Sequence, residues 1–474
     1  MADSFRTEKD SLGEMKVPTD ALWGAQTQRA VENFPISNLR FPRSFIAAMG
    51  MIKKAAAETN HELGLVPGDV ARDIVAAADE VIAGALDQHF VLDIFQTGSG
   101  TSSNMNANEV IANRAIQIRG GNIGSKGVHP NDHVNLGQSS NDVIPTAMQV
   151  AACVRMRQEL VPALQHLQTA LEKKAGEFDD IVKSGRTHLM DATPVRLGQE
   201  YAGFAAQVSL GIRRVQEAAN DLAELPLGGT AVGTGVNTHA DFAVQTIDRL
   251  SKAAGVQFRE AKDHFERQGT RDTVVYAHGA LNTLAVSFSK IANDMRLLAS
   301  GPSAGIAEIT LPAIQPGSSI MPGKVNPVIP EAITMLSAQV MGNHTTITVG
   351  GLGSYFELNV MMPVMAHALL QSIELIAAGA RVFADKCIDG TTANIERCNE
   401  LLERNPSLAT ALAPRIGYDL AATIAKESFK RKITAREVAY ELSGLKKEEV
   451  DEIMNAKEMT HPGIPGGVIL PGGG

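Results

Sequence analysis

Apolar residues recur at helical spacing along most of the 474-residue chain. In the segment 145–182 an apolar stripe keeps to one side at spacings of three, four and six residues; its members are Val150, Val154, Leu160, Leu164, Leu167 and Leu171. Four further segments, 197–225, 272–299, 328–349 and 358–386, are longer than the average globular helix of about 11–12 residues and lack the alternation of strands. The pattern predicts a mainly α protein with five long helices in an elongated bundle.

The segment 358–379, LNVMMPVMAHALLQSIELIAAG, is apolar around most of its circumference. A helix of this kind must be buried on all sides, whereas one layer of a bundle covers only one side. We therefore expect bundles from several chains to pack together in an oligomer. The low aromatic content of 4% suits helices that approach one another closely.

The two ends of the chain differ from this central region. Residues 1–137 form a mixed, mostly helical segment with Gly, Asn and Pro breaks, and residues 138–393 hold the five long helices. Residues 394–474 predict a small charged helical module, with short helices at 435–441 and 447–454, and a mobile tail from Thr460. The sequence thus predicts a central bundle domain flanked by smaller N- and C-terminal domains.

Composition narrows the class of function. With 43 Lys and Arg against 52 Asp and Glu, the net charge is −9, which argues against a binder of nucleic acid or anionic membranes. The three cysteines, Cys153, Cys387 and Cys398, are far apart and predict neither a disulfide framework nor a cysteine metal site. The charged N-terminus is no secretory signal, and we find no uninterrupted apolar run of membrane-spanning length. We expect a soluble intracellular protein.

Four breaks between helical segments are rich in small and polar residues: 97–106, 129–142, 185–194 and 316–327. Each break could be an ordinary loop. Four breaks with the same polar residues beside long helices indicate instead a binding site for a small dianionic acid, because hydroxyls, amides and N–H groups at helix starts bind carboxylates. Lys324 supplies a positive charge, and His188 is a candidate proton-transfer group. Glu331 could pair with a histidine, or simply complement a helix dipole.

Other motifs do not fit. Gly317 and the pair Gly323–Lys324 resemble a phosphate loop, but the spacing is one residue too long and Val325 replaces the required Ser or Thr. His129, Asp132 and His133 could ligate a metal ion, yet Pro130 should break any helix that aligns the two histidines. We expect no metal site there.

The same breaks carry a family resemblance. GSSIMPGKVNP at 317–327 resembles the signature of the fumarase/aspartase superfamily of lyases. DALWGAQTQRAVENF, QTGSGTSSNMNANEV, HPNDHVN, QSSNDVIPT, GRTHLMDATP, LGGTAVGTG and the C-terminal IGYD are similar to class II fumarate hydratase, in order and over nearly the full length. The nearest rival is aspartate ammonia-lyase, from which His188, Ser140 and the stretch 23–27 (WGAQT) distinguish the chain. Another superfamily lyase and a non-catalytic lens-crystallin use of the fold are further alternatives.

The resemblance implies reversible anti hydration of fumarate to L-malate in the tricarboxylic acid cycle, without a metal or organic cofactor. It implies a homotetramer whose central helices form one core and whose active sites each draw on three subunits. The compartment would be the cytoplasm, with an organellar matrix as the alternative. No nucleic acid or membrane partner is implied.

The resemblance also implies the site residues. The catalytic group is His188, Ser318, Lys324 and Glu331. The substrate-binding group is Ser99, Gly100, Thr101, Ser139, Ser140, Asn141, Thr187, Ser319, Val325 and Asn326. A second dicarboxylate site comprises His129, Pro130, Asn131 and Asp132. Either Ser318 or a water held by His188 would take the carbon-bound proton, with Glu331 coupled to His188.

Three positions in two regions depart from the family pattern. Asp263 and His264 stand where Asn-Lys is common, and His133 stands where Asp is frequent. We expect the first difference to change local electrostatics and not the reaction.

Overall fold

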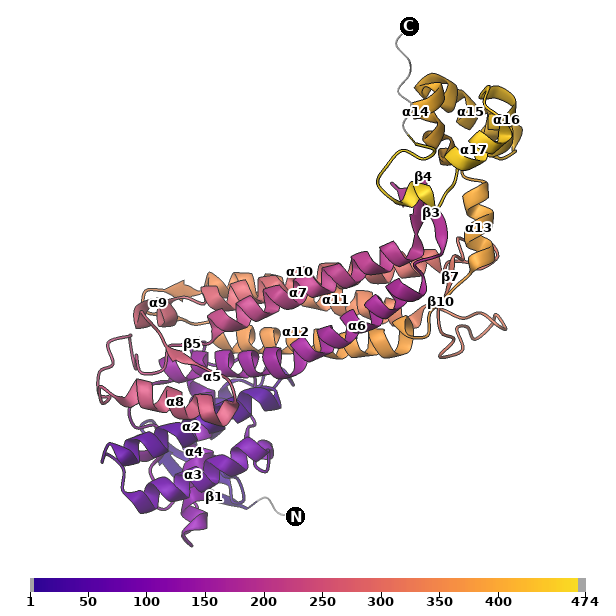
Figure 1. The fold of residues 1–474 in the computed structure, drawn as a ribbon. Coiled ribbons are helices and arrows are strands. Elements are labelled where there is room, and N and C mark those ends of the chain that lie inside the picture. The colour runs from indigo at the N-terminus through magenta and orange to yellow at the C-terminus, as the bar shows by residue number, and fades with distance from the viewer. Residues whose placement is uncertain (1–3, 468–474) are drawn as a thin grey trace. The chain divides into compact units, whose positions relative to one another are not determined.

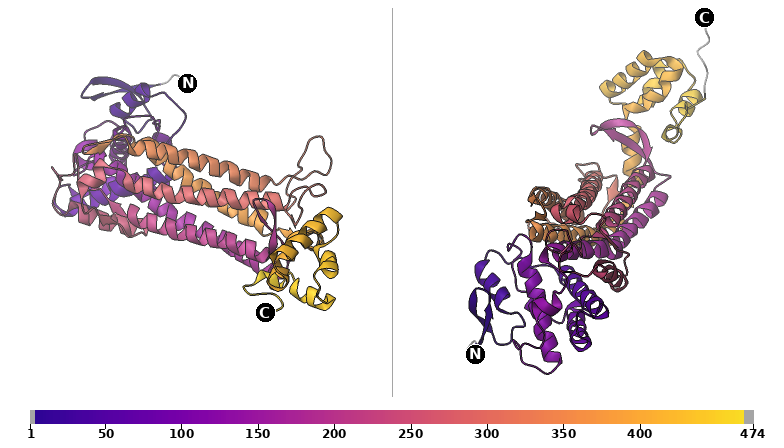
Figure 2. Two further views of the ribbon diagram at one scale, coloured as in Figure 1. Left: turned by 90° about the horizontal axis from the view of Figure 1, so that it is seen from above. Right: turned by 90° about the vertical axis from the view of Figure 1, so that its left-hand side faces the viewer.

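The computed structural model describes residues 4–467 of the chain. These residues form two compact units. The first comprises residues 1–163, 211–286 and 336–378, and the second comprises 164–210, 287–335 and 379–474, with the undescribed ends left aside. Helices α7 (Leu197–Leu222), α10 (Asp272–Leu298), α11 (Val328–Gly351) and α12 (Met362–Phe383) each contribute one part to each unit. Figures 1 and 2 show these long helices as the dominant elements.

The remaining helices are shorter. They are α1 (Ala25–Asn33), α2 (Arg43–Glu62), α3 (Gly68–Ala83), α4 (Thr101–Ile118), α5 (Ser140–Arg155), α6 (Val161–Glu177), α8 (Phe242–Ala254), α9 (His264–Gly269), α13 (Ile395–Glu403), α14 (Ala413–Ile416), α15 (Tyr418–Arg431), α16 (Ala435–Leu442) and α17 (Lys447–Ile453). Short 3-10 helices lie at Asp87–His89, Pro406–Leu412 and Glu458–Thr460, and π-helical turns at Pro130–Val134, Met156–Leu160 and Ala384–Ile388.

The long helices confirm the helical periodicity. In the first predicted helical segment, residues 145–182, five of the six residues of the apolar stripe are buried and Val154 is half-buried. The one spacing that does not fit a 3.6-residue period, from Val154 to Leu160, coincides with the π-helical turn Met156–Leu160. Several predicted boundaries were wrong. The first helical stretch begins at Ser140 and not at Pro145, and α7 ends at Leu222 and not at residue 225, because Glu224–Leu225 forms a strand. The first helical stretch ends at Glu177 and not at residue 182, because strand β3 begins at Val182. Helix α12 begins at Met362 and not at residue 358, because Leu358–Asn359 forms strand β9.

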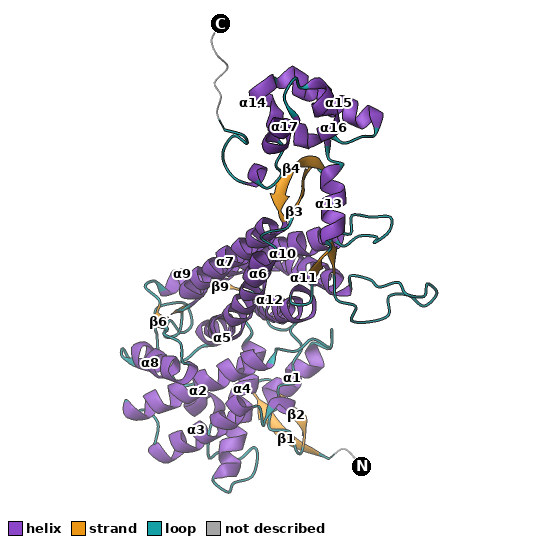
Figure 3. Cartoon of the chain, turned by 45° about the vertical axis from the view of Figure 1, so that its right-hand side comes forward, coloured by secondary structure: helices purple, strands orange, loops and turns teal. Residues whose placement is uncertain are grey.

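Strands are short and occur as two-stranded pieces throughout the described residues (Figure 3). The antiparallel pairs are β1 (Phe5–Asp10) with β2 (Gly13–Pro18), β3 (Val182–Thr187) with β4 (Met190–Arg196), β7 (Ile309–Thr310) with β10 (Thr392–Ala393), and β8 (Ser354–Tyr355) with β9 (Leu358–Asn359). The parallel pair is β5 (Glu224–Leu225) with β6 (Arg259–Glu260). Sequence periodicity missed them because their exposed and buried positions are largely polar.

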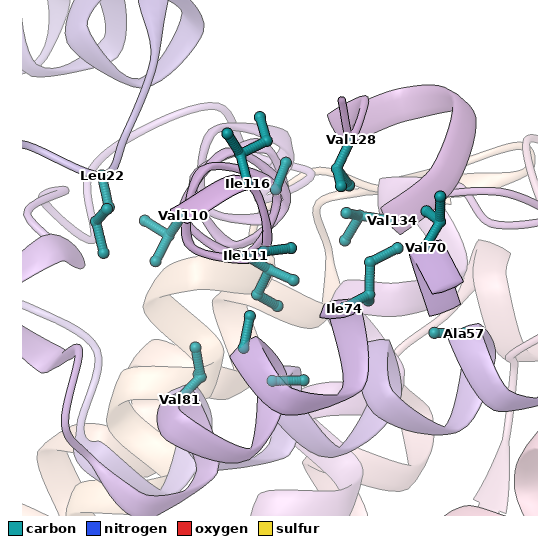
Figure 4. Close-up of a cluster of buried hydrophobic side chains, with 14 of the residues drawn as sticks. Leu22, Ala57, Val70, Ile74, Val81, Val110, Ile111, Ile116, Val128 and Val134 are labelled. Carbon is teal, nitrogen blue, oxygen red and sulfur yellow. The ribbon is translucent and has the colours of Figure 1, made fainter. Parts of the chain in front are cut away.

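A hydrophobic cluster in the first unit fixes α2, α3 and α4 to one another. Figure 4 shows part of it, including Ala57 of α2, Ile74 of α3, Ile111 of α4 and Val134 of the turn Pro130–Val134. All four side chains are essentially inaccessible to solvent. The cluster therefore holds the C-terminal half of α4 and the turn that follows His129.

Most residues of helix α12 are buried within the single chain, whereas Glu374, Ala378 and Val382 are exposed. The packing of bundles from several chains stays a prediction. Among the described residues, the stretch Met362–Ile388 is long and apolar enough to cross a membrane by length and composition alone, although Gln371, Glu374 and Arg381 interrupt it. Two-thirds of its most apolar window is buried inside the fold, as expected for a core helix.

A stripe of exposed residues runs along α11. Its members recur at alternating spacings of three and four and include Met335, Ala338, Gly342, Thr345, Val349 and, just beyond the end of the helix, Leu352. Met335, Val349 and Leu352 are 68%, 53% and 75% exposed. Apolar and small residues at this spacing form the seam of a helix that packs against another helix.

The C-terminal part of the second unit has its own core of residues from α13 to α17, and the two short helices predicted there are confirmed as α16 and α17. The tail was expected to be mobile from Thr460. Its last residues, 468–474, lie outside the described residues.

Candidate active site

The residues expected to form the site fall into two sets. The first unit holds residues 99–101, 129–132 and 139–141, and the second unit holds 187–188 and 318–331. Each set is built by a different local structure. No hydrogen bond or ion pair joins His188 to Glu331 within the described chain, so their pairing stays a prediction.

The stretch 316–327 is an irregular loop that ends where α11 begins, as its prolines and glycines predict. The loop closes on itself. The Gly317 amide donates to the Lys324 carbonyl at 2.9 Å, and the Asn326 side chain donates to the Gly317 carbonyl at 2.5 Å. A Cβ at Gly317 would lie 2.4 Å from the Lys324 carbonyl oxygen, so this closure requires glycine.

The Ser318 hydroxyl oxygen is held by backbone donors. It accepts N–H groups of Ile320 at 3.2 Å and Met321 at 2.9 Å. Two donors on one oxygen stabilise negative charge there, which a serine needs if it is to act as a base. Lys324 is exposed and makes no ion pair with a described residue, so its ammonium is available to a ligand. Ser319 and Val325 are also exposed on this loop.

His188 lies at the tip of the β3–β4 hairpin. The strands are joined by a two-residue turn in which His188 and Leu189 both have positive φ, 56° and 61°. Asn-Gly is the usual pair in this geometry because other side chains are strained there. Thr187, His188 and Leu189 are all exposed. The chain therefore holds a histidine and an apolar residue outward in a strained turn, which is typical of a functional site.

A buried ionic network supports this hairpin, and sequence analysis did not find it. Glu308, fully buried, accepts two hydrogen bonds from Arg186 at 2.8 and 2.9 Å and lies 3.2 Å from the ammonium of Lys183. Lys183, also fully buried, contacts Glu200 at 2.9 Å. Asn405 adds hydrogen bonds to Ser184 Oγ at 3.0 Å and to the Ala192 carbonyl at 2.8 Å. The base of the hairpin is thus fixed while its tip is exposed.

In the first unit, two helix N-termini carry the remaining predicted residues. Gly100 precedes α4 with φ of 70°, and a Cβ there would lie 2.8 Å from Ile144. Ser99 and Thr101 share a hydrogen bond between their hydroxyl groups at 2.8 Å. Exposed N–H groups at a helix start favour an anionic ligand.

At the start of α5, some predicted groups already have partners. Ser139 caps the helix by accepting from the Asn141 amide at 3.2 Å, and the Asn141 side chain donates to the Ala231 carbonyl at 2.7 Å. Ser140 Oγ accepts from the Asn104 side chain at 3.0 Å. Ser140 therefore keeps its own hydroxyl hydrogen for another acceptor.

Asp142 holds the adjacent glycine-rich loop in place. Its fully buried carboxylate accepts from the amides of Ser139 at 3.0 Å, Gly228 at 3.1 Å and Thr230 at 2.9 Å. Burial raises the pKa of Asp142 to about 6, and the backbone hydrogen bonds act in the opposite direction. This assigns the loop 227–238 a structural role at the rim of the site.

These elements line an open pocket of about 490 Å³ in the first unit. Its lining is largely polar and comprises Asn104, Met105, Asn131, Asp132, Asn135, Leu136, Gly137, Gln138, Ser139, Ser140, Thr230, Ala231, Val236 and Asn237. Ser139 and Ser140 of the expected substrate-binding group thus share one pocket with Asn131 and Asp132 of the expected second site. We call it the amide pocket.

The segment after His129 corrects one sequence inference. Pro130 does not break the structure there, because it occupies the first position of the turn Pro130–Val134, where its missing N–H needs no partner. His129 and His133 are consequently close, and the His129 amide donates to His133 Nδ1 at 3.0 Å. Across residues 4–467 no group of three or more His, Cys, Asp or Glu side chains is arranged to hold a metal ion.

The departure at Asp263 and His264 has a structural role. Asp263 caps α9 by accepting from the amides of Phe265 and Glu266. His264 contacts the Pro226 carbonyl through Nδ1 at 2.9 Å and Glu260 through Nε2 at 3.0 Å. The three cysteines are buried and form no disulfide.

Comparison with known proteins shows the family of the chain. The family model described as lyase matches residues 13–342, and the one described as fumarase C C-terminus matches 408–461. The chain is 54% identical to a class II fumarate hydratase of Halobacterium salinarum, over 98% of this chain and 99% of that protein. It is 52% identical to a mitochondrial fumarate hydratase of Saccharomyces cerevisiae, over 98% and 95%.

The fold agrees as well. The crystal structure of a class II fumarase from Schistosoma mansoni matches with a TM-score of 0.95 at 39% identity, covering 97% of this chain and all of that one. Full-length identity of this level, together with the matching fold, leaves one assignment. The chain belongs to the class II fumarate hydratase family of lyases.

Proposed function

We propose that this protein catalyses the reversible anti hydration of fumarate to L-malate, as a tricarboxylic acid cycle enzyme without a metal or organic cofactor. Family membership supports the reaction. The structural observation that supports it is the loop 316–327. Two backbone N–H groups converge there on the Ser318 oxygen, and the Lys324 ammonium makes no hydrogen bond or ion pair with a described residue.

The chemistry explains why such a loop is needed. Removing a proton from the carbon next to a carboxylate leaves a carbanion whose charge must move into that carboxylate. Fixed donors are then required, since they stabilise the developing charge without reorganising. We assign that role to Lys324, Asn326 and the loop N–H groups. The groups at 99–101, 139–141 and Thr187 would hold the carboxylates, with Ser319 and Val325 completing the loop.

Proton transfer needs groups on opposite faces of the substrate. We assign Ser318 to one face and His188 to the other, with Glu331 of a neighbouring subunit coupled to His188. Ser318 takes the carbon-bound proton in this scheme. The alternative gives that step to a water held by His188, with Ser318 as a binding group only.

The site requires more than one chain. We propose a homotetramer in which the exposed stripe of α11, from Met335 to Leu352, packs against other copies. Gly342 lies in this stripe, and a Cβ added there would meet nothing within 4 Å in the single chain. A mid-helix glycine lowers helix stability by about 1 kcal/mol, so a neighbouring helix would account for its presence.

The variant Gly342→Arg should keep the helix content of the parent by circular dichroism yet sediment as a smaller species than a tetramer. An unchanged tetramer would contradict the assignment.

The compartment is proposed on the same basis. Yeast and Arabidopsis relatives are named as mitochondrial, whereas the bacterial and archaeal relatives carry no such term. We propose a cytoplasmic enzyme, with an organellar matrix as the alternative.

Ultraviolet absorbance tests the function. Fumarate absorbs through its conjugated double bond and malate does not, so malate should produce rising absorbance and aspartate should not. Production of fumarate from aspartate alone would instead identify an ammonia-lyase. Ser318→Ala serves as the matched inactive control.

A further inference from the structure

A fully buried lysine lies behind the amide pocket. Lys53, in the middle of α2, has no solvent exposure, and its ammonium makes three hydrogen bonds. The acceptors are Asn104 Oδ1 at 2.8 Å, Asn135 Oδ1 at 2.9 Å and Gln138 Oε1 at 2.9 Å. These bonds use all three donors of the ammonium, so Lys53 offers none to a ligand.

The three acceptors are side-chain amides that line the pocket. An amide whose oxygen faces an ammonium cannot rotate by 180°, because its NH2 group would then meet the cation. The NH2 group of Asn104 is thereby directed to Asn135 Oδ1 at 3.2 Å and to Ser140 Oγ at 3.0 Å. Lys53 thus determines which way the Asn104 amide points.

This orientation decides what Ser140 can do. Since Ser140 Oγ accepts from Asn104, its hydroxyl hydrogen remains available, and no acceptor for it is present among residues 4–467. If Asn104 were reversed, its oxygen would take that hydrogen, and Ser140 would lose its donor capacity toward the pocket.

The buried charge is costly, which argues that it is not there for packing alone. Burial lowers the pKa of Lys53 to about 7, while the negative charge of Asp142 acts to retain the proton. A methionine would fill similar volume on α2 without this penalty. Rules of packing are commonly broken in this way at functional sites.

We propose that Lys53 is a positioning residue for the substrate: by fixing the Asn104 amide it keeps the Ser140 hydroxyl as a hydrogen-bond donor to a substrate carboxylate. The inference rests on the proposed function, in which Ser140 binds the dicarboxylate. Lys53 itself does not contact substrate.

A double-mutant cycle on the full-length enzyme tests this. Lys53→Met should lower kcat/KM for malate about tenfold, the size expected for one hydrogen bond to a charged group, mainly through KM. Ser140→Ala should cause a similar loss. Combining the two should cost no more than Ser140→Ala alone, because both remove the same donor. Lys54→Met, on the next residue of α2, is the control and should leave kcat/KM unchanged, since its ammonium pairs with Asp79 at the surface.

Asn104→Asp separates positioning from stability, and keeps the test valid if Lys53→Met does not fold. The new carboxylate would strengthen the contact with Lys53 but accept the hydrogen of Ser140. We expect unchanged or higher resistance to denaturant with a lower kcat/KM, and no further loss of kcat/KM when Asn104→Asp is combined with Ser140→Ala. Additive losses, or full activity of Asn104→Asp, would overturn the positioning role. Full activity of Ser140→Ala would overturn both the positioning role of Lys53 and the proposed substrate pocket. If Ser140→Ala lowers kcat/KM but Lys53→Met does not, only the positioning role is overturned.

Discussion

Replacing Glu308 by glutamine should weaken the second unit at the hairpin that carries His188. The substitution keeps the size of the side chain but removes the charge that faces Arg186 and Lys183. Two cations then share a single carboxylate, that of Glu200 at 2.9 Å from Lys183. Because Lys183 and Glu308 are fully buried, solvent cannot compensate for the missing charge.

Leaving a buried charge without its partner costs about 3–5 kcal/mol. The loss should appear as a lower denaturant midpoint and as faster amide hydrogen exchange in β3 and β4. Turnover should fall as well, because the strained turn at His188 depends on a fixed base. Glu396→Gln, which removes an exposed carboxylate of α13 in the same unit, is the matched control and should behave as the parent.

A second variant checks the cause of this loss. Arg186→Leu combined with Glu308→Leu removes one charge of each sign and leaves Lys183 paired with Glu200. This variant should recover part of the stability lost in Glu308→Gln. If Glu308→Gln and Glu396→Gln have the same midpoint and the same exchange rates, the network does not support the hairpin and the reasoning is refuted.

Three further predictions concern the site. Ser318→Ala and His188→Asn should each lose most turnover while remaining tetrameric. Co-refolding the two inactive variants should restore measurable malate dehydration, because some mixed sites would then hold both native groups. No recovery would contradict a site shared between subunits. Lys324→Met should raise KM and lower kcat together in steady-state assays, and unchanged kinetics would remove Lys324 from the site. Asp142 has a folded-state pKa raised from 3.8 to about 6, so between these values the folded state binds more protons than the unfolded state. The free energy of unfolding should therefore fall as pH rises through this window. Asp142→Asn should lack this part of the fall in denaturant titrations at pH 4 and pH 6, and the same pH dependence in both proteins would contradict the buried assignment.

Much of the fold was predictable from the chain because its long helices bury a continuous apolar stripe. Leu160, Leu164, Leu167 and Leu171 are each fully buried, so their spacing reports directly on packing. The loop 316–327 was equally predictable, since proline and glycine exclude helix there. These features depend on local sequence alone.

Other features depend on contacts between distant residues. The buried positions of β3 include Lys183 and Ser184, which give no apolar alternation, and their partners lie far along the chain. Lys53 looks like a surface lysine beside Lys54 until Asn104, Asn135 and Gln138 are seen to converge on it. The positive φ of His188 could not be predicted either, because His-Leu is not a pair that favours such a turn.

The proposed mechanism requires that the loop 316–327 hold the reacting carboxylate. A crystal structure of the assembled enzyme with a nitro analogue of the carbanion tests this most directly. We predict that the nitro oxygens contact Lys324 and Asn326, with the Ser318 oxygen beside the carbon that would lose its proton. An analogue bound at full occupancy away from that loop, with the loop unchanged, would contradict the assignment.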